Sequence, residues 1–258
     1  MVPFFMEERC MKNEMNDNFD VFDKYFLGFD ISDKMIQFKY NHSYRVLHQC
    51  DELSFVLNLD EDDNYIACLI GLLHDIGRFS QWTKNKSFSD ELLDHAQLGI
   101  KILFDEEKIK DYDVSSDDYE IIKKAILNHN KFKIDEDLTV REKLHSKIIR
   151  DADKIDILYT YSESVLKIDT DNSNIRDEIH DEFFKHNIID IRKCNTINER
   201  AVAFFASIYD LNYDYSKGYI LDKNYITKIY DSLDNKEVIK PYYEEVIKYL
   251  EGSVKNDR

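Results

Sequence analysis

Glycine and proline are scarce in this chain, with six Gly and two Pro among its 258 residues. Tight turns rely on these two residues, so a fold with many strands and hairpins would need more of them. Their scarcity favours long helices joined by short polar loops. Because 43% of the residues are hydrophobic, the chain can also bury a sizeable core. We therefore expect an all-α protein that forms a single domain over residues 1–258.

Apolar residues recur at helical spacing along much of the chain. Asp33 is suited to cap a helix that runs to about Leu57, and Asp60 to Asp63 are suited to cap the next one. That next helix, Tyr65 to about Asp75, contains the apolar run IACLIGLL and is expected to be buried at the centre. We expect Gly77 to end it.

The rest of the chain divides into further helices and polar segments. The complete set of predicted helices spans residues 21–29, 33–57, 65–75, 94–104, 117–129, 140–162, 199–210, 222–233 and 238–250. The predicted non-helical segments are a loosely ordered lead-in at 1–18, loops at 78–90 and 105–117, and a polar stretch of weak periodicity at 163–196.

The formal net charge of the chain is −17. A protein that wraps a nucleic acid needs a basic face, so we expect no nucleic-acid polymer as a partner. A nucleotide substrate stays open, because a bound metal ion can supply positive charge locally. The four cysteines are widely spaced, and we find neither a signal peptide nor an apolar run of about 18 residues. We therefore expect a cytoplasmic protein that does not span a membrane.

The pair His74 and Asp75 directly follows the apolar run. A polar pair in such a place is costly unless something binds it. Histidine is the commonest metal ligand and aspartate supplies a hard oxygen ligand, so the pair predicts a metal site. Ligands drawn from several helices are a common way to build a metal centre inside a bundle. Further candidates lie on other predicted helices or helix ends: His42, His95, His129, Asp151, Asp153 and Asp156.

Three motifs in order, NHSYRV, LLHDIGRF and RDADKID, resemble those of the HD-domain superfamily of metal-dependent phosphohydrolases. The resemblance covers about residues 35–160 and implies a helical HD bundle there, with residues 161–252 as a helical C-terminal extension. It also implies four ligands for a first metal ion: His42, His74, Asp75 and Asp153. On a helical wheel, Asp151 and Asp156 lie closer to the apolar stripe than Asp153 does, so Asp151 stays open as the last ligand.

Two further histidines match the subset of this superfamily that binds two metal ions. His95 in HAQLG and His129 in AILNHN resemble the extra histidines of that subset. The resemblance therefore implies a dinuclear site in which Asp75 is the bridging ligand. The Gly-Tyr-Pro signature of the cyclic-dinucleotide branch is missing after His129, which argues against that branch. Ligands of this kind suit one or two ions of Mn, Fe, Co, Ni, Zn or Mg.

The resemblance implies hydrolysis of a phosphate ester of a small phosphorylated metabolite, with nucleotides as the preferred class. A metal-bound water has a lowered pKa and becomes a nucleophile near neutral pH, and the same metal polarises a phosphoryl oxygen. Asp75 and Arg78 are then the expected catalytic residues, and Asp75 is a ligand as well. Arg78 is expected to hold the phosphate bidentately, and the resemblance implies that Lys154 also approaches it.

Two other functions stay open. The six ligands also resemble those of the di-iron oxygenases on this scaffold, which cleave C–C or C–P bonds with dioxygen. The other alternative is a nucleotide-binding regulatory module without catalysis, against which the intact ligand set argues. The sequence fixes neither the substrate nor the oligomeric state. The remaining histidines are assigned to structure or to the surface: His48, His145, His180 and His186.

Overall fold

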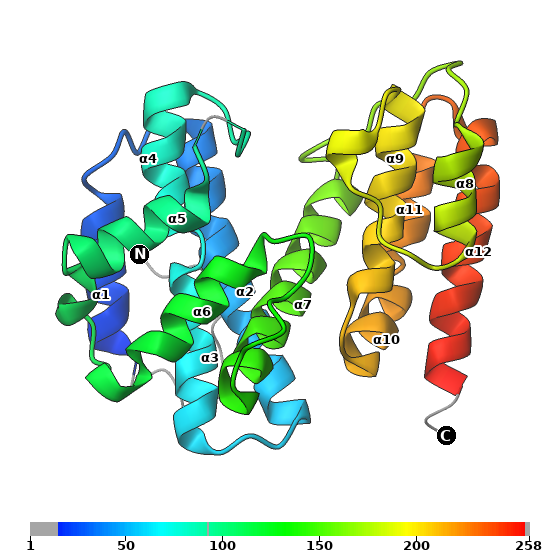
Figure 1. Cartoon of the computed structure of the whole chain (residues 1–258). Coiled ribbons are helices and arrows are strands. Elements are labelled where there is room, and N and C mark those ends of the chain that lie inside the picture. The colour runs from blue at the N-terminus through cyan, green and yellow to red at the C-terminus, as the bar shows by residue number, and fades with distance from the viewer. Residues whose placement is uncertain (1–14, 92, 256–258) are drawn as a thin grey trace. The chain divides into compact units, whose positions relative to one another are not determined.

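The computed structural model describes residues 15–91 and 93–255, and these residues form helices, turns and loops without a strand (Figure 1). The all-α class predicted from the sequence is therefore confirmed. The chain divides into two compact units, residues 1–153 and 154–258. That the whole chain forms one domain stays a prediction.

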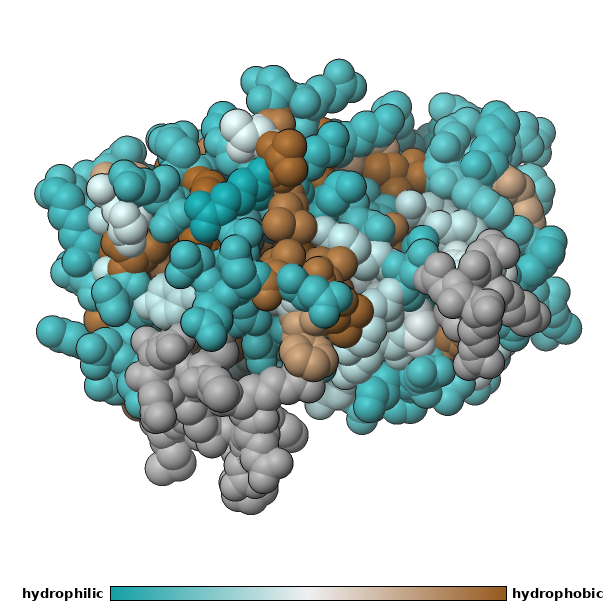
Figure 2. Space-filling model, turned by 90° about the horizontal axis from the view of Figure 1, so that it is seen from below, coloured by the Kyte–Doolittle hydropathy of each residue, from teal (hydrophilic) through white to brown (hydrophobic). Residues whose placement is uncertain are grey.

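In the described part of the chain, no helix combines the length and the apolar character that a membrane crossing requires. Hydrophilic side chains cover most of the face shown in Figure 2. This agrees with a sequence in which 34% of the residues are charged.

The first unit is a bundle of helices joined by short loops. Its α-helices are α1 (Asn16–Phe26), α2 (Lys34–Val56), α3 (Glu61–Leu73), α4 (Ile76–Asn85), α5 (His95–Ile100), α6 (Tyr119–His129) and the part of α7 (Val140–Ser162) up to Asp153. Shorter helical turns are η2 (Lys101–Asp105), η3 (Lys108–Asp111) and η4 (Ser116–Asp118). Both predicted caps are present. The Asp33 side chain accepts a hydrogen bond from the Met35 N–H, and the Asp60 side chain accepts one from the Asp63 N–H.

The end of α3 is held tightly against α2. A Cβ on Gly71 would lie 2.8 Å from the Leu47 Cα, so only glycine allows the two backbones to come this close. The close approach buries every residue from Ile66 to Leu73, as expected for the central helix. It also fixes the point at which His74 and Asp75 leave the helix.

The segment after Asp75 differs from its prediction. α3 ends at Leu73 and α4 begins at Ile76, so residues 78–85 are helical instead of a loop, and Gly77 lies inside a helix instead of ending one. α4 is anchored by Ile76 and Phe79, which are fully buried. Two large apolar side chains in one short helix do not give the repeated spacing from which a helix is recognised in a sequence.

The first helix also begins earlier than predicted. Residues 16–18 belong to α1 and not to a lead-in, while residues 1–14 of that lead-in lie outside the described residues. The buried Asn18 side chain donates a hydrogen bond to the Tyr65 hydroxyl at 2.6 Å and accepts one from the Asp113 N–H at 2.8 Å. These contacts join α1 to distant parts of the unit, and a local sequence pattern cannot reveal them.

The second unit has a hydrophobic core of its own. Its helices are the rest of α7, α8 (Asp177–Phe184), η5 (Ile191–Lys193), α9 (Ile197–Ala206), η6 (Ser207–Asp210), α10 (Asp214–Asp222), α11 (Tyr225–Asp231) and α12 (Lys236–Lys255). The core includes Phe183, Phe205, Ile220, Ile229, Val246 and Leu250. The sequence did not predict α8, which lies in the stretch described as weakly periodic, or α10. Both are short, and each buries only two residues.

Candidate metal centre

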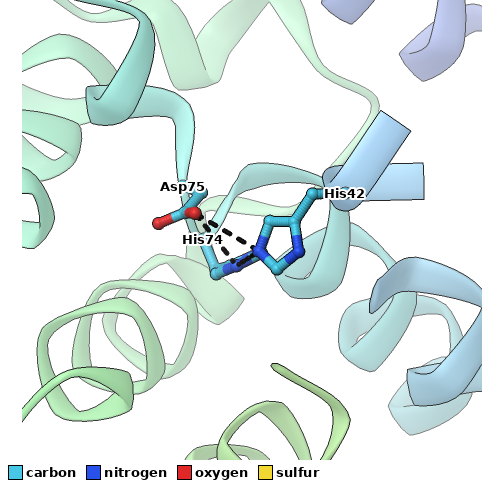
Figure 3. Close-up of side chains that lie close together, drawn as sticks. All are labelled: His42, His74 and Asp75. Atoms are coloured by element: carbon cyan, nitrogen blue, oxygen red, sulfur yellow. Dashed lines mark hydrogen bonds and ion pairs between the residues drawn. The ribbon is translucent and has the colours of Figure 1, made fainter. Parts of the chain in front are cut away.

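The centre is built at the break between α3 and α4. His74 is the C-terminal cap of α3, and its Nδ1 lies 2.8 Å from the Gly71 carbonyl oxygen one turn earlier. When Nδ1–H donates to that carbonyl, Nε2 is left as the free acceptor or metal-binding atom. Asp75 follows directly, and Figure 3 shows its carboxylate beside the imidazoles of His74 and His42.

One group of side chains surrounds the Oδ2 atom of Asp75. His42, from α2, brings its Nε2 to 3.2 Å from His74 Nε2 and to 3.3 Å from Asp75 Oδ2. Asp153, from α7, brings its Oδ1 to 3.2 Å from His42 Nε2 and to 3.7 Å from His74 Nε2. The four residues that the sequence assigned to a first metal ion therefore lie together.

A second group surrounds Asp75 Oδ1. His95, at the start of α5, and His129, at the end of α6, place their Nε2 atoms 2.9 Å apart. Asp75 Oδ1 lies 3.2 Å from the first of these atoms and 3.7 Å from the second. His129 Nδ1 faces the Ile126 carbonyl at 2.6 Å, and His95 Nδ1 faces Asp90 Oδ1 at 2.7 Å. Both rings therefore direct Nε2 inward.

The donor atoms fit a divalent transition metal. Metal–nitrogen bonds of 2.0–2.1 Å in a tetrahedral site put two ligand atoms about 3.3 Å apart. The donor separations around each oxygen of Asp75 are close to that value, between 2.9 and 3.7 Å. Histidine and carboxylate groups in this geometry could hold a metal ion in three overlapping combinations: His42, His74 and Asp75; His74, His129 and Asp153; and Asp75, His95 and His129.

The electrostatics favour charged carboxylates in this buried place. Burial by itself would raise the pKa of Asp75, but the charges of Lys39 and His74 and hydrogen bonds from His129 and His42 hold it well below its ordinary value. Burial likewise opposes ionisation of Asp153, and hydrogen bonds from His42 and His74 again bring its pKa well below the ordinary value. Both aspartates are therefore available as anionic ligands.

Arg78 and Asp151 do not belong to the groups that could hold a metal ion. The Nη1 of Arg78 donates to three protein acceptors: Gln81 Oε1 at 2.8 Å, the Phe88 carbonyl at 2.7 Å and Asp90 Oδ1 at 3.0 Å. Its Nε is buried 3.5 Å from Asp75 Oδ1 without a hydrogen bond. The Nη1 atom is thus engaged by the protein, and bidentate binding of a phosphate by Arg78 stays a prediction. Asp151 is buried and belongs to none of the three ligand combinations found among the described residues.

Lys154 belongs to the second unit, where its Nζ forms an ion pair with Asp210 Oδ2 at 2.7 Å. Its approach to a phosphate stays a prediction. The histidines assigned to structure or surface lie outside the ligand combinations. His145 is buried and pairs with Asp63 at 3.0 Å, and His48 is exposed. His180 bonds to Tyr242 and His186 pairs with Glu245.

Sequence reasoning missed two residues beside the centre. Lys39 places its Nζ 2.7 Å from Asp75 Oδ2. Asp90 accepts hydrogen bonds from Arg78 and Gln81 as well as facing His95. Lys39 stands one helical turn before His42, and this spacing is the signal that could have pointed to it. Asp90 lies in a non-helical segment, where no periodicity marks it.

The protein is therefore all-α, and it has a candidate divalent-metal centre. Histidines from several helices surround the carboxylate of Asp75 there. Residues 40–158 match the family model described as the HD domain. Over these residues the chain therefore carries an HD domain, as its motifs indicated, and this domain is typical of metal-dependent hydrolases. A search of curated proteins and a search of solved structures gave no match.

Proposed function

We propose that this protein is a metal-dependent phosphohydrolase that cleaves a phosphate ester of a small phosphorylated metabolite, with nucleotides as the preferred class. The observation that carries the proposal is that Asp75 faces both groups of histidines. Each of its carboxylate oxygens faces the Nε2 atoms of two histidines. Such an arrangement suits a carboxylate that bridges two cations, and paired cations stabilise both the attacking and the leaving oxygen in phosphoryl transfer.

In this proposal the first ion is held by His42, His74, Asp75 and Asp153, and the second by Asp75, His95 and His129. A divalent cation bound there would lower the pKa of a coordinated water and polarise a phosphoryl oxygen. The donor set suits Mn, Fe, Co, Ni or Zn, and also Mg at the carboxylates, so we leave the metal unspecified.

The side chains around the ligands then have distinct tasks. Asp90 holds His95 Nδ1, which keeps the imidazole turned so that Nε2 faces Asp75. Arg78 braces the segment that contains Phe88 and Asp90 and leaves its Nη2 for a single contact with the phosphate. Lys154 is proposed as a further phosphate-binding residue.

The test combines elemental analysis of the purified protein with a panel of phosphomonoesters and phosphodiesters. We expect bound transition metal and metal-stimulated release of phosphate or of a phosphomonoester. His74→Ala should lose both, whereas His48→Ala, at an exposed position on α2, should keep both. A wild-type protein with neither bound metal nor metal-stimulated activity would refute the proposal.

A pair of aspartate variants tests the last ligand. Asp153→Asn should lose metal, because Asp153 Oδ1 faces both histidines of the first group. Asp151→Asn should keep its metal, because Asp151 lies outside the ligand combinations. The reverse result would make Asp151 the ligand.

The same assays separate the alternative reactions. Release of phosphate without oxygen favours the hydrolase, and iron with oxygen uptake during turnover would favour a di-iron oxygenase. Nucleotide binding without any reaction would favour a regulatory module. We also propose a cytoplasmic location, which is supported by the free thiols of the described cysteines Cys50, Cys68 and Cys194.

A further inference from the structure

Lys39 is a mostly buried lysine that ends at the candidate metal centre. Its side chain is 12% exposed, and its Nζ lies 2.7 Å from Asp75 Oδ2. The ammonium also lies over two aromatic rings, 5.6 Å from the centroid of Phe38 and 5.3 Å from that of Phe88. At these distances the ring faces attract the ammonium group.

The hydrogen bonds of Lys39 are only partly used. An ammonium group has three N–H donors, and within the described residues Asp75 is the acceptor that it contacts. Arg78, which lies beside Asp75 Oδ1, instead donates hydrogen bonds from its Nη1 to three protein acceptors. Lys39 therefore keeps N–H donors for an incoming anion, whereas the Nη1 atom of Arg78 is engaged by the protein.

Once a metal ion is bound, no negative charge of the ligands remains to balance the ammonium of Lys39. The first ligand group contains two carboxylates, Asp75 and Asp153, and one divalent cation balances both. The ammonium then shares the Asp75 carboxylate with a cation of the same sign, and an anion is needed to balance it. A phosphate group meets that need without any further change in the protein.

Lys39 also lies where the buried centre meets the surface. The side chains of His42, His74, Asp75, His95 and His129 are at most 4% exposed. The more accessible groups beside them are Lys39 at 12%, Arg78 at 14%, Asp153 at 18% and Asp90 at 36%. Lys39 is therefore one of the cations that an anion arriving from solvent can contact beside the centre.

We propose that Lys39 is a further cation that binds the non-bridging phosphoryl oxygens of the substrate, in addition to Arg78 and Lys154. This inference rests on the proposed phosphohydrolase function. It predicts that Lys39 contributes to binding of the anion and not to binding of the metal.

The test uses the full chain, Mn²⁺ and inorganic phosphate as probes. Lys39→Met and Lys39→Gln remove the charge, Lys39→Arg keeps it, and Lys34→Met is a control at an exposed position of the same helix. Calorimetry first measures the Kd of Mn²⁺ and then that of phosphate for the Mn²⁺-loaded protein. We expect both uncharged variants to bind Mn²⁺ at least as tightly as the wild type and to bind phosphate about 10- to 100-fold more weakly. Lys39→Arg and Lys34→Met should bind phosphate within about threefold of the wild type.

Phosphate affinity that does not change in the uncharged variants would overturn the inference. Loss of Mn²⁺ binding, or an unfolded circular dichroism spectrum in both of them, would show that Lys39 holds Asp75 in place, and would overturn it as well. A wild-type protein that binds no Mn²⁺ or other divalent metal would instead refute the proposed function. The two failures are therefore distinguishable.

Discussion

Replacing Gly77 with alanine should damage the metal centre without removing a ligand. Gly77 lies in the first turn of α4, and a Cβ there would be 2.1 Å from the His95 carbonyl oxygen and 2.8 Å from the Gly99 nitrogen. A carbon and an oxygen in contact normally stay about 3.3 Å apart or more. Both neighbours are backbone atoms, so no side-chain rotation relieves the clash. α4 and α5 would have to separate by about 1 Å.

The cost follows from two opposing effects. Overpacking of this kind destabilises by about 1–3 kcal/mol, and alanine regains about 1 kcal/mol over glycine through its higher helix propensity. Because both clashing neighbours are backbone atoms, the overpacking cost falls in the upper part of this range, at about 2–3 kcal/mol. The net loss is then about 1–2 kcal/mol, which lowers the Tm of a chain of this size by about 2–8 °C. Because His95 moves with its backbone, metal affinity should fall by about tenfold.

Gly99→Ala is the matched control. Its Cβ would meet Ile76 Cγ2 at 3.4 Å and Gly77 N at 3.7 Å, which are ordinary contacts in the same helix pair. This variant should be as stable as the wild type or more so, and should keep its metal. Thermal unfolding followed by circular dichroism, with Mn²⁺ titrated by calorimetry, measures both effects. Equal stability and equal metal affinity in the two alanine variants would refute the reasoning.

Three further predictions use other parts of the structure. Asp90→Ala removes the acceptor that orients His95, so the Kd of the metal should rise by about 10- to 100-fold; unchanged affinity in a calorimetric titration would contradict this. A metal ion that binds only the folded protein stabilises it, so removing metal with a chelator should lower the Tm; an unchanged Tm would count against a resident ion. In the second unit, hydrogen bonds from Arg176 lower the pKa of Glu199 from 4.5 to about 2. The stability that Glu199 contributes is present above pH 4.5 and is lost as the pH falls toward 2, so Glu199→Gln should be less stable than the wild type at pH 6, with a difference that shrinks in acid. Denaturant unfolding at pH 6 and in acid measures the free energy of unfolding of both proteins. A stability difference that does not change with pH would rule out this role.

The long helices could be predicted from the sequence because their evidence is local. α2, α6 and α7 contain apolar residues at regular spacing over several turns, and Asp33 caps α2 as expected. The short helices α4, α8 and α10 were missed. Each is held by a few buried side chains that find their partners in other elements, so the local pattern is too weak to identify it.

The ligand candidates could be found because they lie in short motifs that follow one another in a recognisable order. His42, His74 and Asp75 were identified by their neighbours in the chain, and the fold brings them together. Their binding of a metal ion stays a prediction, as does that of His95, His129 and Asp153. The choice of Asp153 over Asp151 came from the resemblance, and the helical wheel alone pointed the other way.

By itself, the sequence determined the helical class, the HD domain and the candidate metal ligands, because helical periodicity and motif order are properties of neighbouring residues. Only the tertiary structure decided what surrounds those side chains. It gave each oxygen of Asp75 its own pair of histidines, engaged Arg78 with protein acceptors and brought Lys39 to the centre. These contacts join residues up to dozens of positions apart, and their geometry depends on how closely helices pack, as at Gly71 and Gly77.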